Sequence, residues 1–273
     1  MSDVHPAIAS GNLAVITGGA DGIGFAVAQA LAERGMRIAL ADIDGERVTE
    51  AAAALPEASG HALDVSDRNA VDALARELGP VSVLMNNAGT GGGGDALSNP
   101  DGWDRVLGTN LMGVLHGVQA FVPAMAESGR PGLVINTGSK QGITTPPGDT
   151  AYNVSKAGIK ALTEGLAHTL RNTDGCQVSA HLLIPGFTFT GMMRRRMPQK
   201  PDAAWEPHQV AEQLLASIAA GDFYILCEDN ETTAEMDRKR IAWSAGDLTE
   251  NRPALSRWHP DWADRFADWM KRD

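Results

Sequence analysis

The chain has 273 residues, a formal net charge of −11 and two cysteines, Cys176 and Cys227. A chain of this length can bury a large core without disulfides or metals, and two distant cysteines form neither a disulfide scaffold nor a metal-binding pattern. The acidic balance argues against the basic face with which proteins hold nucleic acid. We see no apolar leader and no run long enough to span a membrane, so we expect a cytoplasmic protein without a metal, membrane or nucleic-acid partner.

The chain opens with a predicted strand, a glycine-rich turn and a helix. The apolar run 13–17 is typical of a buried strand, and an amphipathic pattern after the turn ends at Gly35. Gly18, Gly22 and Gly24 stand between the two elements. Glycines there let the backbone come close to a pyrophosphate, and the free N–H groups at the start of the helix can bind it. This unit therefore predicts a dinucleotide-binding turn.

The second predicted strand, Arg37–Asp42, ends in an acid. Asp42 follows the glycines by roughly 20 residues, the spacing at which a carboxylate binds the ribose 2′-hydroxyl of NAD. Alternatively, Asp42 caps the helix that follows it. Asp21 adds a second carboxylate within the turn, and two negative charges there would repel the 2′-phosphate of NADP. The pattern favours NAD.

Strands and helices continue to alternate along the chain, which is typical of a parallel sheet covered by helices on both faces. We expect an α/β protein with a doubly wound parallel sheet of about seven strands, the Rossmann architecture, in a single catalytic domain over residues 1–273. The glycine run 91–94 is expected to be a mobile loop. The further predicted strands are 60–65, 81–85, 132–137, 178–184 and 223–227, and the further predicted helices are 67–78, 100–127 and about 149–171.

Tyr152 and Lys156 lie one helical turn apart in the last of these helices. A phenol has a pKa of about 10, and a neighbouring ammonium favours the phenolate and so lowers that pKa. A tyrosine tuned in this way can exchange a proton with a substrate hydroxyl or carbonyl. Taken alone, the pair fits an ordinary half-exposed helix equally well.

Together these patterns resemble the short-chain dehydrogenase/reductase family, in its single-domain branch. The resemblance runs from about Leu13 to Cys227, and the complete ordered set of motifs is highly specific. The motifs read Thr17-Gly18-x-x-x-Gly22-x-Gly24, Asp64-Val65, Asn87-Ala88-Gly89, Asn110-x-x-Gly113, Ser139 ahead of Tyr152-x-x-x-Lys156, and Pro185-Gly186 followed by Thr190.

The resemblance implies a role for each matching residue. Tyr152 would be the general acid and base, and Ser139 would hydrogen-bond the substrate oxygen. Lys156 would hold the nicotinamide ribose and lower the pKa of Tyr152, while Asn110 would hold a water that links Lys156 to solvent. The residues implied in binding NAD are Gly18, Asp21, Gly22, Ile23, Gly24, Asp42, Ile43, Asp64, Val65, Asn87, Ala88, Gly89, Tyr152, Lys156, Pro185, Gly186, Thr188 and Thr190.

Two residues depart from the family pattern. Gln141 replaces a small residue shortly after Ser139, where it either donates a hydrogen bond to a polar substrate or points into solvent. Thr188 stands where an apolar residue is usual, which leaves the role of its side chain open.

The segment 187–205 is the expected substrate lid. Phe187, Met192 and Met193 are its expected apolar substrate contacts, because methionine adapts readily to ligands of different shape. The arginine run 194–196 within the lid either attracts an acidic substrate or is a solvated cluster of charges.

The last predicted strand is followed by an extension, residues 228–273. Thr232 to Glu235 resembles a capping box, which predicts a helix to about Ser244, and a second helix is expected after Pro260. Large aromatic side chains need burial, either on the same subunit or against a neighbouring subunit or the mouth of a site. We expect the extension to cross a subunit boundary and to help close the substrate pocket beside Met192 and Met193. Its tryptophans are Trp243, Trp258, Trp262 and Trp269.

The function expected from the resemblance is hydride transfer between NAD and a secondary alcohol or ketone by a homodimer or homotetramer. The alternatives are an NADPH-preferring carbonyl reductase, a non-catalytic NAD-binding or scaffold protein, and a lyase or epimerase on the same fold. The joint presence of Asn110, Ser139, Tyr152 and Lys156 argues against a non-catalytic protein, which need not retain all four.

Overall fold

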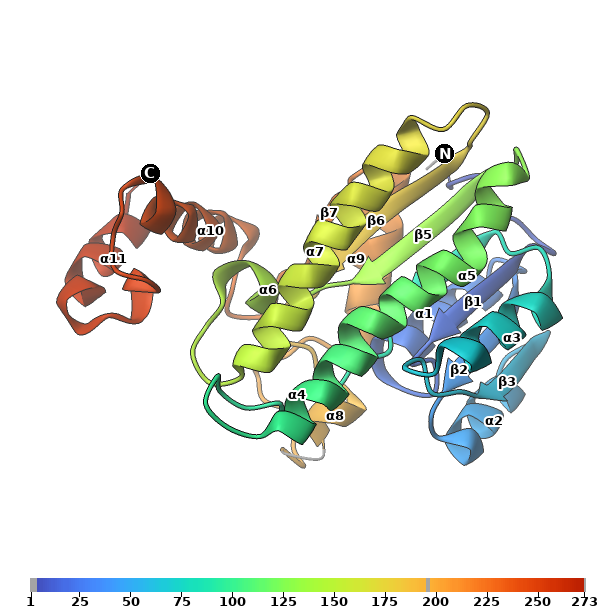
Figure 1. Ribbon diagram of the computed structural model, residues 1–273, viewed down its shortest axis with the longest axis horizontal. Coiled ribbons are helices and arrows are strands. Elements are labelled where there is room, and N and C mark those ends of the chain that lie inside the picture. Colours follow the sequence, from blue (N-terminus) through green and yellow to red (C-terminus); the bar gives the residue numbers. More distant parts are fainter. Residues whose placement is uncertain (1–3, 195–196, 273) are drawn as a thin grey trace.

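The computed structural model describes residues 4–194 and 197–272. Its centre is one sheet of seven strands in the order β3-β2-β1-β4-β5-β6-β7 (Figure 1). Every pair of neighbouring strands runs parallel. This is the doubly wound α/β sheet that the sequence predicts. The strands are β1 Leu13–Thr17, β2 Arg37–Asp42, β3 Ala58–Ala62, β4 Val83–Asn86, β5 Gly132–Thr137, β6 Val178–Ile184 and β7 Tyr224–Leu226.

Helices cover both faces of the sheet. The α-helices of the described residues are α1 Gly22–Ala32, α2 Gly45–Ala53, α3 Arg68–Leu78, α4 Pro100–Leu107, α5 Gly113–Glu127, α6 Gln141–Thr144, α7 Thr150–Arg171, α8 Gly191–Arg194, α9 Pro207–Ala220, α10 Ala234–Thr249 and α11 Ala263–Met270. Successive strand residues point to opposite faces, so Ala14 and Ile16 pack toward α1, α2 and α9, whereas Leu13 and Val15 pack toward α3, α5 and α7. Within the described ranges, no helix is both long and apolar enough to cross a lipid bilayer.

The strand boundaries agree with the prediction for β1, β2, β5 and β6. The third strand differs, because it covers Ala58–Ala62 rather than 60–65. Its register explains the difference, since Asp42 at the end of β2 already pairs with Ala62. Asp64 and Val65 therefore lie in the loop that follows the strand, at the functional edge of the sheet.

Aspartates begin four of the helices. Asp21, Asp44, Asp67 and Asp149 are the N-caps of α1, α2, α3 and α7, and each carboxylate accepts a hydrogen bond from a backbone N–H of the first turn. Because Asp44 caps α2, the alternative in which Asp42 caps that helix is wrong. The Asp42 carboxylate instead remains at the end of β2.

The predicted helix 100–127 is one helical run that contains a π-helical turn, Gly108–Met112, between α4 and α5. Such turns insert an extra residue into a helix and often mark functional sites. Asn110 lies in the middle of this turn and is fully buried.

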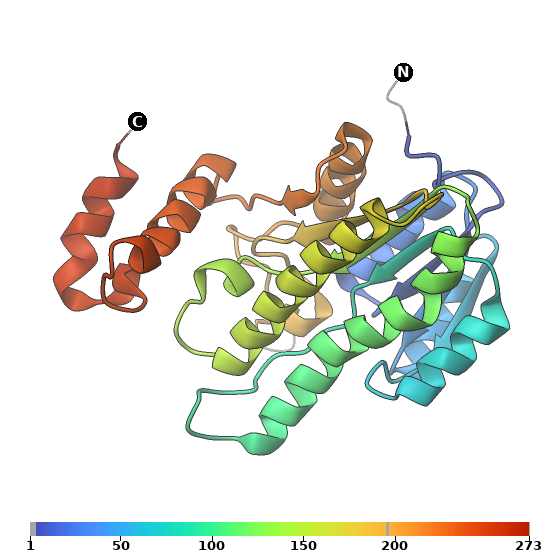
Figure 2. The ribbon, with the colours of Figure 1, turned by 45° about the horizontal axis from the view of Figure 1, so that its top comes forward.

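After β7 the chain leaves the sheet and forms α10 and α11, which project from the body beside α6 (Figures 1 and 2, red). Two short 3₁₀ turns, Ser256–Trp258 and Pro260–Trp262, connect them. The cap of α10 is Thr233 rather than Thr232, and the helix runs to Thr249, beyond the predicted end. We refer to residues 228–272 as the tail.

The tail has a small aromatic core of its own. Trp243 is 5 % exposed and contacts the rings of Trp262, Phe266 and Trp269 at centroid distances of 6.2, 5.4 and 5.8 Å. Its indole N–H donates to Ser256 Oγ at 2.8 Å. The tail's own contacts thus bury Trp243, whereas Trp262, Phe266 and Trp269 stay half-buried and Trp258 is 37 % exposed. That the tail crosses a subunit boundary and helps to close the substrate pocket stays a prediction.

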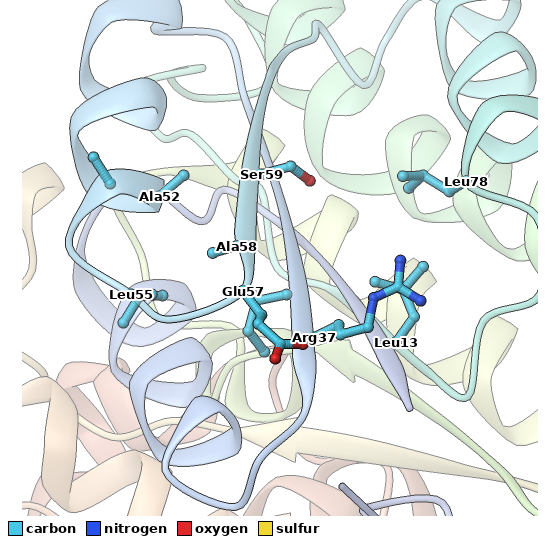
Figure 3. A pocket seen from close by; sticks show the side chains of 10 residues that line it. Leu13, Arg37, Ala52, Leu55, Glu57, Ala58, Ser59 and Leu78 are labelled. Atoms are coloured by element: carbon cyan, nitrogen blue, oxygen red, sulfur yellow. The ribbon is translucent and has the colours of Figure 1, made fainter. Parts of the chain in front are cut away.

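A surface hollow of about 470 Å³ lies at the amino ends of β1, β2 and β3 (Figure 3). Arg37 and Glu57 are its charged lining residues, among apolar side chains such as Leu55 and Leu78. None of the predicted site residues lines it. This hollow is at the opposite end of the strands from the carboxyl edge, where the predicted site residues lie.

Candidate active site

The carboxyl ends of β1 and β4 mark the point where the strand order reverses, which in this architecture opens a ligand crevice. Thr17 ends β1, and its hydroxyl accepts the N–H groups of Asn87 at 3.0 Å and Ala88 at 3.2 Å. The Asn87 amide donates to the carbonyls of Thr17 and Gly18, both at 3.2 Å. The Asn87 side chain therefore stabilises the glycine turn, a role that the sequence did not predict.

The glycine turn leaves no room for side chains. Gly18 has a φ of +63°, and a Cβ there would lie 2.8 Å from the Cα of Ala88. A Cβ on Gly24 would lie 2.4 Å from the Gly18 carbonyl oxygen, and one on Gly22 would lie 3.1 Å from the side chain of Thr190. The bare backbone and the start of α1 form a cradle that fits a pyrophosphate.

The end of β2 offers groups suited to an adenosine. The Asp42 carboxylate accepts the N–H groups of Ala20 at 3.1 Å and Asp44 at 3.2 Å, which fixes its orientation beside the glycine turn. Ile43 follows it and is 74 % exposed. An exposed apolar side chain can pack against a base, and a fixed carboxylate beside it can accept hydrogen bonds from a ribose. Ile23, by contrast, packs partly buried against the core.

The loop after β3 holds the other two predicted adenosine contacts. The Asp64 carboxylate accepts the backbone N–H and the hydroxyl of Ser66 at 2.9 and 2.7 Å. Val65 is buried, and its carbonyl lies 2.9 Å from Nδ1 of His116. The hydrogen bonds of both residues fix the shape of this loop. A bound adenine would lie over it.

Asp21 forms ion pairs with Arg47 at 2.9 Å and Arg194 at 2.5 Å. Burial opposes ionisation, but Arg194, the backbone N–H of Gly22 and Arg47 together outweigh it and hold the pKa of Asp21 below its ordinary value. The three side chains and Gly191 line a hollow of about 260 Å³ beside the glycine turn. The expected repulsion of a 2′-phosphate by Asp21 is therefore not supported, because two arginines compensate its charge.

Ser139, Tyr152 and Lys156 come together, as the sequence predicts. Tyr152 and Lys156 lie on α7, and the Lys156 ammonium is 5.6 Å from the centroid of the Tyr152 ring. The Lys156 Nζ donates to the Thr137 carbonyl at the end of β5, at 2.8 Å. Ser139 follows β5, and its hydroxyl is near enough to the Tyr152 phenol to lower the pKa of that phenol. A hydroxyl, a phenol and a buried ammonium thus meet at the carboxyl edge of the sheet.

The pKa of Tyr152 differs from the prediction. Burial raises it, the nearby Ser139 hydroxyl lowers it, the charge of Asp149 raises it, and the net shift is upward. The predicted net lowering of the pKa is therefore not found in the protein alone, because desolvation of the phenolate outweighs the groups that favour it. Burial also lowers the pKa of Lys156, to about 8. At neutral pH the Tyr152 phenol is therefore protonated, with a charged lysine beside it.

Asn110 anchors the chain around Gly89. Its amide N–H₂ donates to the Thr90 carbonyl at 2.9 Å and to Ser155 Oγ at 3.0 Å, and its oxygen accepts the Thr90 N–H at 2.7 Å. A Cβ on Gly89 would lie 3.4 Å from the Asn110 oxygen and 3.7 Å from the Lys156 Nζ. Asn110 therefore shapes the floor beside Lys156, and the water relay through it stays a prediction.

Asp149 is a site residue that the sequence analysis missed. Its carboxylate accepts the N–H of Tyr152 at 3.2 Å and the N–H of Gly92 at 2.6 Å. A Cβ on Gly93 would lie 2.4 Å from the Cβ of Ala151. The glycine run is thus anchored to α7 rather than free, and its glycines allow close approach. An acid just before a helical Tyr-x-x-x-Lys pattern is the signal that could have identified this cap.

The loop after β6 begins at Pro185 and reaches the glycine turn. Thr190 lies against Gly22, where a Cβ would be 3.1 Å from the Thr190 side chain. Thr188 is 7 % exposed and donates to the Gly186 carbonyl at 3.2 Å. The Thr188 side chain therefore points into the protein. Its role, which the sequence left open, is to hydrogen-bond the backbone of its own loop.

The expected substrate contacts surround this edge. Phe187, Met192 and Met193 are half-buried, and the two methionines lie on α8. Gln141 is exposed at the start of α6, which is compatible with either of its predicted roles. Of the arginine run, residues 195–196 lie outside the described part of the chain.

The comparisons with known proteins agree with this geometry. Residues 12–201 match the family model for short chain dehydrogenases. The uncharacterized oxidoreductase YxbG of Bacillus subtilis (strain 168) is 37 % identical over 164 residues, which are 56 % of this chain and 59 % of that protein. The chain thus matches less than two thirds of that relative's length.

Two solved structures extend the likeness. A short chain dehydrogenase/reductase from Burkholderia phymatum in complex with NAD is 33 % identical, with a TM-score of 0.79 over 89 % of this chain and 96 % of that chain. A metagenomic short-chain oxidoreductase in complex with NADP is 32 % identical, with a TM-score of 0.67 over 81 % of this chain and 98 % of that chain. The protein belongs to the short-chain dehydrogenase/reductase family of oxidoreductases.

Proposed function

We propose that this protein is an NAD-dependent dehydrogenase that transfers a hydride between the nicotinamide and a secondary alcohol or ketone. The observation that carries the proposal is the meeting of Ser139, Tyr152 and Lys156 at the carboxyl edge of the sheet. A scaffold protein has no need of these three groups close together. Both cysteines are free, which fits the reducing cytoplasm that we propose as its location.

The cofactor supplies or accepts the hydride when bound, and the protein handles the proton. In ketone reduction, the Tyr152 phenol donates its proton to the carbonyl oxygen, and the Ser139 hydroxyl hydrogen-bonds the same oxygen. The raised pKa of Tyr152 keeps the phenol in the protonated state that reduction needs. Lys156 holds positive charge beside the phenol and stabilises the phenolate left after transfer.

Alcohol oxidation should speed up as the pH rises. Tyr152 must lose its proton to act as a base, and below its raised pKa the phenolate fraction grows by about tenfold per pH unit. The increase should flatten above pH 8, because Lys156 then loses the charge that favours the phenolate. Initial rates of oxidation over a pH series check this. A pH-independent oxidation rate would show that Tyr152 is not the base.

The preference for NAD should depend on Asp42. With its orientation fixed, the carboxylate can accept ribose hydroxyls, and it repels a 2′-phosphate. Asp42→Ala should weaken NAD binding by about tenfold and raise the catalytic efficiency with NADP. Asp72→Ala, which removes an acid paired with Arg68 on α3, is the matched control. Equal efficiencies with NAD and NADP in the unmodified protein would contradict the proposal.

A second candidate is an NADPH-preferring carbonyl reductase. The pair of arginines beside Asp21 favours it, because guanidinium groups bind phosphates well and the Arg47 side chain is 51 % exposed. If Arg47 binds a 2′-phosphate, Arg47→Ala should weaken NADP binding and leave NAD binding unchanged. The same titrations that test Asp42 therefore separate the two candidates.

We propose that the protein works as a homodimer or homotetramer. Met112, in the π turn, and Val154, on α7, are 41 % and 44 % exposed. Tyr224 on the edge strand β7 is 52 % exposed. Apolar side chains on helix faces are buried when two copies meet through the same surface, the commonest form of assembly.

A further inference from the structure

Lys140 is the point where the tail meets the candidate active site. Its ammonium lies 2.5 Å from Oδ2 of Asp237 and 3.4 Å from Oδ2 of Asp229. The side chain of Lys140 is 18 % exposed, and that of Asp237 is 6 % exposed. Separating a largely buried ion pair leaves an uncompensated charge in the protein, which costs free energy. The pair therefore holds the Lys140 and Asp237 side chains in place.

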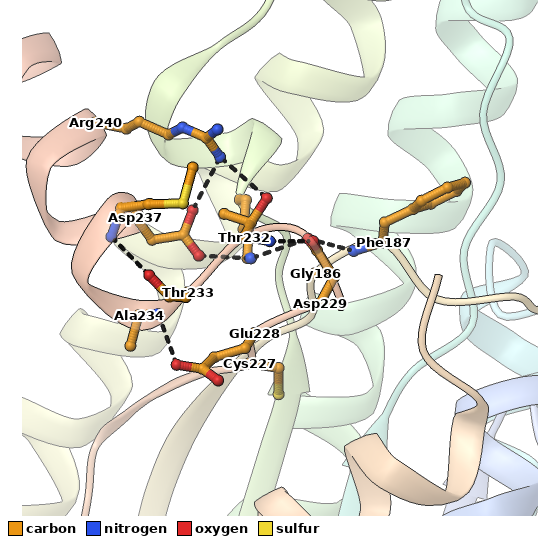
Figure 4. A network of polar contacts seen from close by, with 12 residues as sticks. Gly186, Phe187, Cys227, Glu228, Asp229, Thr232, Thr233, Ala234, Asp237 and Arg240 are labelled. Carbon is orange, nitrogen blue, oxygen red and sulfur yellow. Dashed lines mark hydrogen bonds and ion pairs between the residues drawn. The ribbon is translucent and has the colours of Figure 1, made fainter. Parts of the chain in front are cut away.

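Asp229 connects this ion pair to the backbone of the site. Besides Lys140, its carboxylate accepts the N–H groups of Phe187 at 3.3 Å and Thr232 at 2.8 Å (Figure 4). Burial opposes ionisation, yet the charge of Lys140 and these N–H groups hold the pKa of Asp229 below its ordinary value. Phe187 belongs to the loop after β6, so Asp229 ties that loop to the tail.

Asp237 receives less support from its surroundings. Burial raises the pKa of Asp237, and hydrogen bonding and charge from Lys140 offset only part of this shift. Arg240 lies 3.7 Å from Asp237 and donates to the Thr232 hydroxyl at 3.3 Å. Lys140 is therefore the nearest cation to both acids, and its position depends on the tail.

The backbone of Lys140 is part of the segment that carries Ser139. The Lys140 carbonyl accepts the N–H groups of Ile143 and Thr144, both at 3.1 Å, and so begins α6. A Cβ on Gly142 would lie 2.5 Å from the backbone carbonyl carbon of Lys156. The short helix is thus held directly between the catalytic helix α7 and α10 of the tail.

The Lys140 ammonium also lies close to Gly186, in the loop after β6 that would face the nicotinamide. A Cβ on Gly186 would lie 2.9 Å from the Lys140 Nζ and 2.5 Å from the Glu228 carbonyl oxygen. One charged group therefore joins the Ser139 segment, the loop after β6 and the tail.

We propose that Lys140 is a positioning residue: held between Asp229 and Asp237, its ammonium fixes the place of Ser139 and makes the tail part of the catalytic architecture. The inference rests on the proposed role of Ser139. Its consequence is measurable at Tyr152, because the nearby Ser139 hydroxyl lowers the pKa of Tyr152 against the upward shift caused by burial. Displacing Ser139 should therefore raise the pKa of Tyr152 further.

The test follows Tyr152 directly and needs no turnover. The chain has two tyrosines, so Tyr224→Phe leaves Tyr152 as the sole tyrosine signal in a protein made with ring-labelled tyrosine. Tyr224 is 52 % exposed and bonds Glu164 at the surface. In this background, Lys140→Met should shift the Tyr152 ring resonance and move its titration to higher pH.

Two further variants separate positioning from a direct effect of charge. Asp237→Asn removes a negative charge, and if charge acted directly on Tyr152 the pKa of Tyr152 would fall. If Asp237 instead acts by holding Lys140 in place, the same substitution should raise the pKa of Tyr152. Lys140→Arg should restore the parent titration. Lys160→Met, which breaks the Lys160–Glu164 pair on α7, is the matched control and should leave Tyr152 unchanged.

Kinetic assays supply the second readout. Lys140→Met should reduce kcat/KM for the ketone by about tenfold or more, with NADH affinity within about twofold of the parent, since misplacing a catalytic group costs rate. If folded Lys140→Met and Asp237→Asn both titrate like Lys160→Met, the inference is wrong. If Tyr152 shifts as expected but no alcohol or ketone reacts, the inference stands and the proposed function fails.

Discussion

Tyr152→Phe should reduce turnover by about a thousandfold while NAD still binds. The substitution removes the transferable proton and keeps the ring against Lys156. The glycine turn, Asp42 and Lys156 remain in place to hold the cofactor. Initial rates with a good ketone and fluorescence titration with NADH measure the two quantities separately.

Tyr224→Phe is the matched control, because it also removes one phenol but on an exposed edge strand. It should retain the parent rate. Near-normal turnover in Tyr152→Phe would mean that another group donates the proton. A parallel loss of NADH binding would mean that the phenol acts through the cofactor instead.

Trp243→Ala should unfold the tail while the sheet stays folded. The indole fills the tail's aromatic core, and removing a buried tryptophan costs roughly 3–5 kcal/mol. The aromatic core of the tail lies apart from the sheet, and α6 is the helix of the body against which α10 packs, so the core depends mainly on its own contacts. Hydrogen exchange should show loss of protection in α10 and unchanged protection in β1, β4 and β5.

Trp258→Ala is the control for this substitution, since Trp258 is 37 % exposed. It should leave the exchange of α10 nearly unchanged. Full protection of α10 in Trp243→Ala would show that the tail is held by the body of the protein rather than by its own aromatic core. Loss of protection throughout the sheet would show that the two cores fold as one unit.

The sheet could be predicted from the sequence because its strands are short apolar runs that end at glycines or acids. Buried parallel strands such as Leu13–Thr17 and Gly132–Thr137 carry that signal strongly, and their observed bounds agree with it. The third strand, with Gly60 and His61 and little apolar content, carries a weak signal, and its register depends on pairing with β2.

The parts that could not be predicted arise from contacts between residues far apart in the chain. Asp21 and Arg194 are 173 residues apart, and Lys140 and Asp229 are 89 apart. Such pairings leave no local periodicity to detect. The pKa of Tyr152 was mispredicted for a related reason, since the sequence shows the neighbouring lysine but not the depth of burial that outweighs it.

Hydride transfer itself can be followed with a panel of ketones and NADH that carries deuterium at the transferable position. Consumption of NADH by the unmodified protein should place one deuterium on the carbinol carbon of the alcohol product, detected by mass spectrometry. Tyr152→Phe should bind the same NADH and form almost no labelled alcohol. Binding of NADH and NADPH without transfer to any ketone, and without oxidation of any secondary alcohol, would contradict the proposed function.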